Sequence, residues 1–126
     1  MSARDGSERF RRAKRLRSSK DFSRISREGM RVAGRSFVVL MADQRTGERD
    51  AARLGITVSR RVGPAVVRTR VKRQVREWFR RRATPLPAGK DLVVIARSGA
   101  AHASHAAVVR DLEGALDGLA RRAGGA

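Results

Sequence analysis

One segment of the sequence, residues 64–82, is dominated by side chains that bind anions. Its only acid is Glu77, and its cations are Arg68, Arg70, Lys72, Arg73, Arg76, Arg80, Arg81 and Arg82. Arg60 and Arg61 come just before it. A guanidinium group donates paired hydrogen bonds to phosphate and can also stack on an exposed base. The segment therefore has the side chains of a nucleic-acid-binding surface.

The spacing of this segment predicts a helix with two different sides. Its large apolar side chains recur three or four residues apart, as on one helical face: Val67, Val71, Val75 and Trp78. At about 100° per residue, a polar group lies on the opposite side: Thr69, Arg73, Arg76 and Arg80. Arg68 and Lys72 flank that group. The apolar side is expected to pack on a sheet, which leaves the cations facing outward.

A solvated surface is the ordinary explanation of a charged helix, but the order of the charges argues against it here. Like charges four residues apart are mildly destabilising. That spacing relates one row of cations: Arg68, Lys72, Arg76 and Arg80. Glu77 is placed to relieve only Arg73 and Arg81. The pattern favours an anionic partner.

The whole chain carries the same excess of positive charge. It has 126 residues, a formal net charge of +18 and a sequence pI of about 12.0. Nucleic acid and an anionic membrane are the two polyanions that would relieve such self-repulsion. No apolar run approaches the roughly 20 residues that span a bilayer, and residues 1–20 do not resemble a signal peptide. We therefore expect no membrane partner.

Few residues offer chemistry other than anion binding. The absence of cysteine removes disulfides, thiolate catalysis and cysteine-bearing zinc sites, and it fits the cytoplasmic location that we expect. His102 and His105 lie in an Ala/Ser-rich stretch, where exposed loop or helix-start positions are expected. The acids are scattered rather than clustered. We assign no catalytic residue, no metal ligand and no cofactor bound by the protein alone.

The remaining pattern predicts a single α+β domain. We expect a basic, partly disordered arm over residues 1–17, a single nucleic-acid-binding domain over 18–122 and a flexible tail over 123–126. Helices are predicted over 18–28, 64–82 and 104–122, and strands over 30–33, 37–42, 53–59 and 91–97. The second and third strands are expected to form an antiparallel hairpin. The fold class is then a small, mainly antiparallel sheet of about four strands with three helices, in the order α-β-β-β-α-β-α.

Several motifs together resemble the bacterial ribonuclease P protein subunit family. They are residues 53–63 (RLGITVSRRVG), 65–73 (AVVRTRVKR) and 76–80 (REWFR). Upstream, Arg15-Leu16 and Asp21-Phe22 resemble the family's first helix, and downstream residues 91–97 (DLVVIAR) resemble its last strand. The resemblance covers roughly residues 12–119, with the elements in the same order.

The resemblance implies a role in removing the 5′ leader from precursor tRNA. In that family a large RNA carries the catalytic groups and the magnesium ions, and the protein is a cofactor in a 1:1 complex. A left-handed crossover through the basic helix is implied as well. The residues implied to bind the catalytic RNA are Arg60, Arg61, Arg68, Thr69, Arg70, Lys72, Arg73, Arg76 and Arg80.

The family also holds the leader in a cleft between its first helix and the sheet. The residues implied here are Arg15, Phe22, Phe37 and Val39, although Phe22 and Phe37 could equally belong to the core. The chain departs from the family pattern at four positions: Thr69 and Pro64, where Asn is usual, and Ser26 and Leu40, where aromatic side chains are common. Without those aromatics, stacking on leader bases should be weaker.

Three other functions are compatible with a basic helix. A ribosomal-type structural protein would bind RNA without assisting tRNA cleavage. An architectural DNA-binding protein would prefer duplex DNA and would usually dimerise, but no helix-turn-helix pair or zipper is apparent, and we expect no DNA partner. A nuclease with its own active site would cleave RNA alone and would depend on carboxylates. None of the three accounts for the chain-wide motifs.

Overall fold

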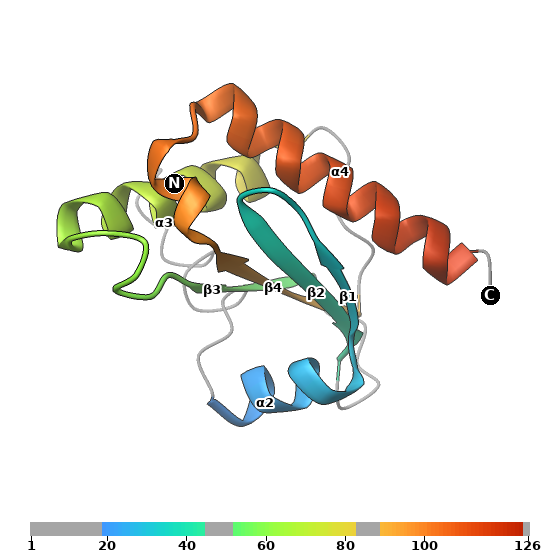
Figure 1. Ribbon diagram of the computed structural model, residues 1–126. Helices are drawn as coiled ribbons and strands as arrows, with labels where there is room; N and C mark the ends of the chain where they lie inside the picture. Colours follow the sequence, from blue (N-terminus) through green and yellow to red (C-terminus); the bar gives the residue numbers. More distant parts are fainter. Residues whose placement is uncertain (1–18, 45–51, 83–88, 125–126) are drawn as a thin grey trace, which may run out of the picture.

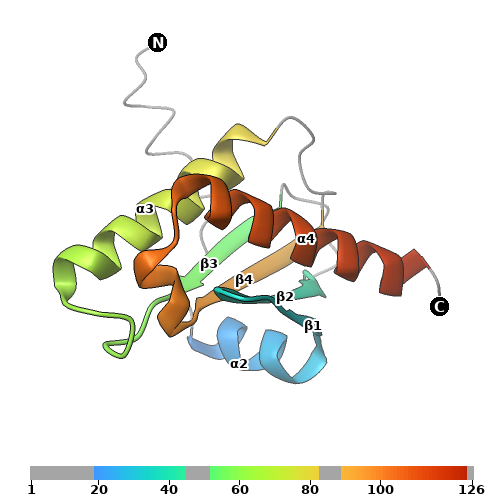
Figure 2. The same ribbon diagram turned by 45° about the horizontal axis from the view of Figure 1, so that its top comes forward.

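The elements form three layers: one helix, a sheet, and two further helices (Figure 1). A computed structural model describes residues 19–44, 52–82 and 89–124. In chain order its elements are α2 (Ser19–Glu28), β1 (Met30–Ala33), β2 (Phe37–Asp43), β3 (Arg53–Thr57), α3 (Ala65–Arg81), β4 (Lys90–Ala96), the 3-10 helix η1 (Ser98–His102) and α4 (His105–Gly124). Helix α2 covers one face of the sheet, and α3 and α4 lie over the other (Figure 2). The predicted α+β class and element order are confirmed.

The sheet has the strand order β1-β2-β4-β3. β2 pairs antiparallel with β1 and with β4, whereas β3 pairs parallel with β4. The predicted hairpin between β2 and β3 is therefore wrong, because β4 lies between them. Leu92, Val93 and Val94 of β4 are all buried, so this strand is covered on both faces and occupies a central position. The left-handed sense of the β3–α3–β4 crossover stays a prediction of the family resemblance.

The side chains of β2 alternate between two hydrophobic cores. Phe37 and Val39 point to the side of α3 and α4, where the larger core lies. Val38 and Leu40 point to the side of α2, where they pack with Ile25 and other residues in a smaller core. The large core fixes the orientation of α3, because Val71, Val75 and Trp78 of that helix belong to it, as their spacing predicts.

A buried ion-pair network joins α2 to the sheet. The carboxylate of Asp91 on β4 is fully buried. It accepts a hydrogen bond from Arg24 Nη2 at 2.7 Å and from Arg53 Nε at 2.8 Å and Nη2 at 2.9 Å. Arg24 also donates to the carbonyl of Asp43 at 2.8 Å. One carboxylate thus connects α2, β3 and β4.

Helix α2 ends at Glu28, and Gly29 follows it as predicted. The reason for a glycine is close approach rather than a left-handed backbone, since Gly29 is not among the described residues with positive φ. A Cβ atom at Gly29 would lie 2.6 Å from the carbonyl oxygen of Ile25 and 2.9 Å from that of Met41. The small residue lets the chain pass directly from α2 into β1.

The turn between β1 and β2 is fixed to α4. The carboxylate of Asp111 accepts hydrogen bonds from the backbone N–H groups of Arg35, Ser36 and Phe37 at 2.9, 3.0 and 3.1 Å. At the start of α4, Ser104 Oγ accepts from the N–H of Ala107 at 3.1 Å, as an N-cap residue does. The Asp111 contacts hold α4 over the turn between β1 and β2.

Parts of the predicted domain plan lie outside the described residues. The predicted arm over residues 1–17 and the last two residues of the predicted tail are among them, as is most of the connection between β2 and β3. Within the described ranges, no helix is long and apolar enough to cross a membrane.

Replacing the buried carboxylate should be costly. The change Asp91→Ala removes the buried carboxylate that Arg24 and Arg53 share, and removing one member of a buried ion pair costs about 3–5 kcal/mol. Urea denaturation of the variant and the parent protein measures this loss. The control is Asp43→Ala, which removes an exposed pair with Lys90 and should cost about 1 kcal/mol or less. Equal losses in the two variants would contradict a central role for Asp91.

Candidate nucleic-acid interface

The turn before α3 presents Arg60 and Arg61 to solvent. Val62 between them and the helix is buried and anchors the turn. The N–H of Gly63 donates to the carbonyl of Arg60 at 3.2 Å. Gly63 has φ +156°, and a Cβ atom there would lie 3.2 Å from Val67, so a side chain would be strained at this position. The turn is thus held in a conformation that exposes the side chains of both arginines to solvent.

All nine residues predicted to bind the catalytic RNA reach the surface on this turn and on α3. Six are exposed: Arg60, Arg61, Thr69, Arg70, Arg73 and Arg80. Three are partly buried: Arg68, Lys72 and Arg76. The structure therefore brings them together along one outward-facing side of α3. It does so because the apolar stripe of the helix is committed to the large core.

Two of these cations also make contacts that stabilise the local fold. Arg68 Nε donates to the carbonyl of Gly63 at 3.1 Å, which closes the turn against the first part of α3. Arg70 Nη2 donates to the carbonyl of Ala101, which ties α3 to η1. Each guanidinium has five N–H donors, so both retain donors for a ligand.

Glu77 pairs with cations nearer the end of α3 than expected. It accepts from Arg80 at 2.8 Å and from Arg81 at 2.9 Å. The expectation that it would relieve Arg73 and Arg81 is therefore wrong for Arg73, because the side chain turns toward the C-terminal end of α3. The hydrogen bond from Arg80 lowers the pKa of Glu77.

Glu113 of α4 neutralises the end of α3. Its carboxylate accepts from Trp78 Nε1 at 2.6 Å and from Arg82 Nε at 2.8 Å. The guanidinium of Arg82 also lies 5.7 Å from the centre of the Trp78 ring, within the range of a cation–π contact. The hydrogen bond from Arg82 lowers the pKa of Glu113. This cluster fixes α3 against α4.

Glu77 and Glu113 pair with cations at the end of α3. The beginning of α3 is therefore the most strongly cationic part of this helix. Neither the first turn of the helix nor the turn before it contains an acid. The free N–H groups at a helix N-terminus add a partial positive charge that also favours anions. Arg60, Arg61 and Arg73 form no ion pair with an acid of the described residues. We call this part, residues 60–73, the cationic surface.

The three described residues that were predicted for a leader cleft are not brought together. Phe37 and Val39 are fully buried in the large core, on the side of the sheet away from α2, so their prediction as cleft residues is wrong. The face of β2 toward α2 carries Val38 and Leu40 instead. Phe22 of α2 is half-buried and packs against that smaller core. Arg15 lies outside the described residues.

The error has a clear origin. Residues 37–42 form a continuous apolar run, so the sequence lacks the polar–apolar alternation that would have shown which residues face α2. The Arg24–Asp91–Arg53 network was missed for a related reason, since its three members lie on different elements. The only signal of this network in the sequence was Asp91, an acid at the beginning of an apolar strand.

The histidines and acids add little chemistry to this surface. His102 and His105 are exposed in η1 and at the start of α4, as predicted. In the part of the chain that the structure describes, no three side chains of His, Cys, Asp or Glu are grouped so that they could hold a metal ion.

The mixed four-stranded sheet and the cationic helix define a class of small, basic α+β proteins. The family model described as Ribonuclease P matches residues 10–120. The chain therefore belongs to the ribonuclease P protein component family.

Relatives and solved structures agree with this assignment. The ribonuclease P protein component of Syntrophobacter fumaroxidans is 43% identical over 108 residues, which cover 85% of this chain and 88% of that protein. The one from Geobacillus thermodenitrificans is 37% identical over 88% of this chain and 87% of its own length. The RNase P protein from Thermotoga maritima is 39% identical, with a TM-score of 0.70 over 85% of this chain and 96% of its own.

A further neighbour is a Staphylococcus aureus RNase P protein mutant, described as having defective mRNA degradation activity. It is 36% identical and has a TM-score of 0.81 over 93% of this chain and 96% of its own. The arrangement of sheet and helices described above is thus that of the family.

The Glu113 cluster should make stability depend on pH. Because the pKa of Glu113 is lowered in the folded protein, its stabilisation is complete above the ordinary value of 4.5 and is lost as the pH falls through the folded pKa. Urea denaturation at a series of pH values from about 6 to 3 should show a smaller loss of stability for Glu113→Gln than for the parent protein. Asp117→Asn removes an exposed acid from the same helix and is the control. Parallel curves for all three proteins would contradict the proposed role of Glu113.

Proposed function

We propose that the chain is the protein subunit of a ribonuclease P holoenzyme. It binds the catalytic RNA through the cationic surface and contacts the 5′ leader of precursor tRNA. In this way it assists the endonucleolytic cleavage that produces the mature 5′ end of the tRNA. The chemistry belongs to the RNA subunit and to the magnesium ions of the RNA-containing holoenzyme, and one protein binds one RNA in the cytoplasm.

The observation that carries this proposal is the acid-free row of exposed cations on the turn and the first half of α3. Arg60, Arg61 and Arg73 reach solvent without an ion-pair partner among the described residues. Arg68 and Arg70 stand beside them and keep spare donors. Phosphates of a folded RNA are the polyanion that matches such a row, and membership of the family supports that choice.

Leader binding rests on the side of the molecule that carries α2. Phe22 is half-buried there, and Ser26 and Arg27 of the same helix are exposed. Leu40, where relatives often have an aromatic side chain, is buried beneath α2 and offers no stacking surface. We therefore expect the leader to be held mainly by contacts to its backbone and only weakly by base stacking.

Reconstitution tests the proposal directly. The purified chain is mixed with a bacterial ribonuclease P RNA at low magnesium, and release of the 5′ leader from precursor tRNA is followed. Cleavage should require both components. Tight RNA binding without stimulation would favour a structural RNA-binding protein. Cleavage by the protein alone would indicate a nuclease site in the protein itself. That outcome is of interest because one structural neighbour is a mutant described as having defective mRNA degradation activity.

Salt dependence tests the assigned surface. Each phosphate contact that is lost should lower the slope of log K against log salt by about 0.7 to 0.9. Arg73→Ala should show this decrease in a titration with the catalytic RNA. The matched control is Arg81→Ala on the same helix, whose charge is already paired with Glu77 and which should change the slope less. Equal effects of the two substitutions would mean that RNA does not distinguish the two ends of α3.

A further inference from the structure

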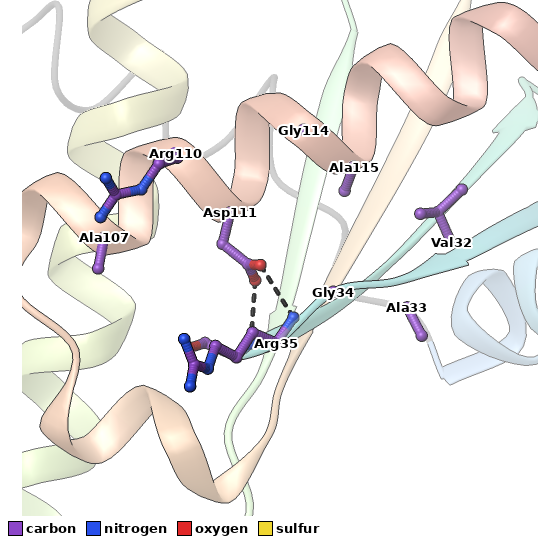
Figure 3. Close-up of a pocket in the computed structure, with 10 residues that line it drawn as sticks. Val32, Ala33, Gly34, Arg35, Ala107, Arg110, Asp111, Gly114 and Ala115 are labelled. Atoms are coloured by element: carbon purple, nitrogen blue, oxygen red, sulfur yellow. Dashed lines mark hydrogen bonds between the residues drawn. The ribbon is translucent and has the colours of Figure 1, made fainter.

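A hollow on the far side of α4 from Glu113 forms a second candidate for anion binding. It has a volume of about 300 Å³ and lies between α4 and the turn from β1 to β2 (Figure 3). Small residues on both elements leave the space open: Ala33, Gly34, Ala107, Gly114 and Ala115. A Cβ atom at Gly114 would meet no other atom within 4 Å, which confirms that the space beside it is free.

Two arginines line this hollow, and a third contacts one of the other residues that line it. Arg35 and Arg110 line it, and both of their side chains extend toward the end of α4 that carries Ala107 (Figure 3). Arg97 Nη1 donates to the carbonyl of Gly34 at 3.0 Å, so this guanidinium lies next to one of the residues that line the hollow. All three arginines are exposed.

The only acid that lines the hollow is already satisfied. The carboxylate of Asp111 accepts the three backbone N–H groups of the turn, which stabilise its negative charge where it lies. A Cβ atom at Gly34 would lie 2.6 Å from this carboxylate, which shows how closely it is drawn into the turn. No acid of the described residues forms an ion pair with Arg35, Arg97 or Arg110.

The residues that line the hollow are suited to bind the phosphate of a nucleotide rather than its base. The residues around the hollow include no aromatic side chain on which a base could stack. Guanidinium groups at the rim are suited to the oxygens of a phosphate, which they can bind with two parallel hydrogen bonds. The hollow is also large enough to admit a sugar together with its phosphate, since ligand sites begin at about 300 Å³.

The hollow is connected to the cationic surface through η1. At one end of this short helix, Ala101 accepts the hydrogen bond from Arg70 of α3. At the other, Gly99 lies beside the turn, since a Cβ atom there would be 3.6 Å from the carbonyl of Arg35. The exposed His102 lies on η1 itself. An RNA bound on the first half of α3 can therefore continue across η1 to the hollow.

We propose that Arg35, Arg97 and Arg110 form a second RNA-backbone site, in which the hollow receives a phosphate and its sugar. The proposal rests on the proposed function, because it assumes that α3 binds RNA. It extends the interface from one helix to a surface that includes η1, the turn between β1 and β2, and the beginning of α4.

Substitutions at the rim and inside the hollow test the site with the full-length protein. Arg35→Ala and Arg110→Ala remove exposed side chains and should leave the fold intact. Each should lower the log–log salt slope by about 0.7 to 0.9, so that affinity falls about threefold less between roughly 50 and 200 mM salt. Arg121→Ala, an exposed cation near the other end of α4, is the control and should leave the slope unchanged.

A matched pair at Gly114 tests the hollow itself. Gly114→Glu and Gly114→Gln add side chains of equal size, and only the first adds a negative charge. Gly114→Glu should weaken RNA binding severalfold more than Gly114→Gln. Equal affinities for the two variants, together with unchanged slopes for Arg35→Ala and Arg110→Ala, would overturn the proposal.

Two titrations identify which RNA binds at the hollow. They also separate the proposal of this second site from the proposed function. Each variant is titrated with the catalytic RNA alone and then, as a holoenzyme, with precursor tRNA. A change in the first titration assigns the phosphate to the catalytic RNA, and a change only in the second assigns it to precursor tRNA. If Arg73→Ala lowers the slope but the hollow variants do not, only the second site is wrong. If neither changes it, the proposed function fails as well.

Discussion

The carboxylate of Asp91 is the contact on which the arrangement of the layers depends. It is fully buried, and it binds one arginine from α2 and one from β3. A buried charge is tolerated only when it is paired and hydrogen-bonded, so the three elements must come together in one geometry. The other well-placed acids act in the same way: Asp111 joins the turn between β1 and β2 to α4, and Glu113 joins α3 to α4.

This use of the acids explains where positive charge remains. The chain has 12 acids and 30 lysines and arginines, so most cations have no acid to pair with. Asp91, Asp111 and Glu113 lie where elements meet, and Glu77 neutralises the end of α3. The turn and the first half of α3 are left with exposed arginines and no acid. The packing of the protein and its cationic surface therefore follow from the same distribution of charge.

The sequence was sufficient to predict those features that depend on local periodicity. The stripe of Val71, Val75 and Trp78 predicts both the helix and the side that it buries, and hence the exposure of Thr69 and Arg73 opposite. The apolar run of β4 indicates a strand covered on both faces. These inferences need only the repeat of one element, so they hold whatever the neighbouring elements are.

Features that depend on pairing between distant elements could not be predicted in this way. The insertion of β4 between β2 and β3 is decided by burial of the whole sheet, and adjacent strands in sequence are only the default partners. The face to which Phe37 and Val39 point depends on how β2 is placed in the sheet, so the prediction of these two residues as cleft residues was wrong. Several cations lie within reach of Glu77, and helical periodicity does not determine which of them it pairs with. The pairing with Arg80 could therefore not be predicted.

The most direct test of RNA binding at the cationic surface is the accessibility of α3 in the complex with the catalytic RNA. The chain contains no cysteine, so single thiols can be introduced without background, at the exposed positions Thr69→Cys on α3 and Ala120→Cys on α4. The rate of alkylation of each thiol is measured with and without the catalytic RNA. We expect strong protection at position 69 and none at position 120. Equal rates at position 69 with and without bound RNA would show that the cationic surface is not the interface.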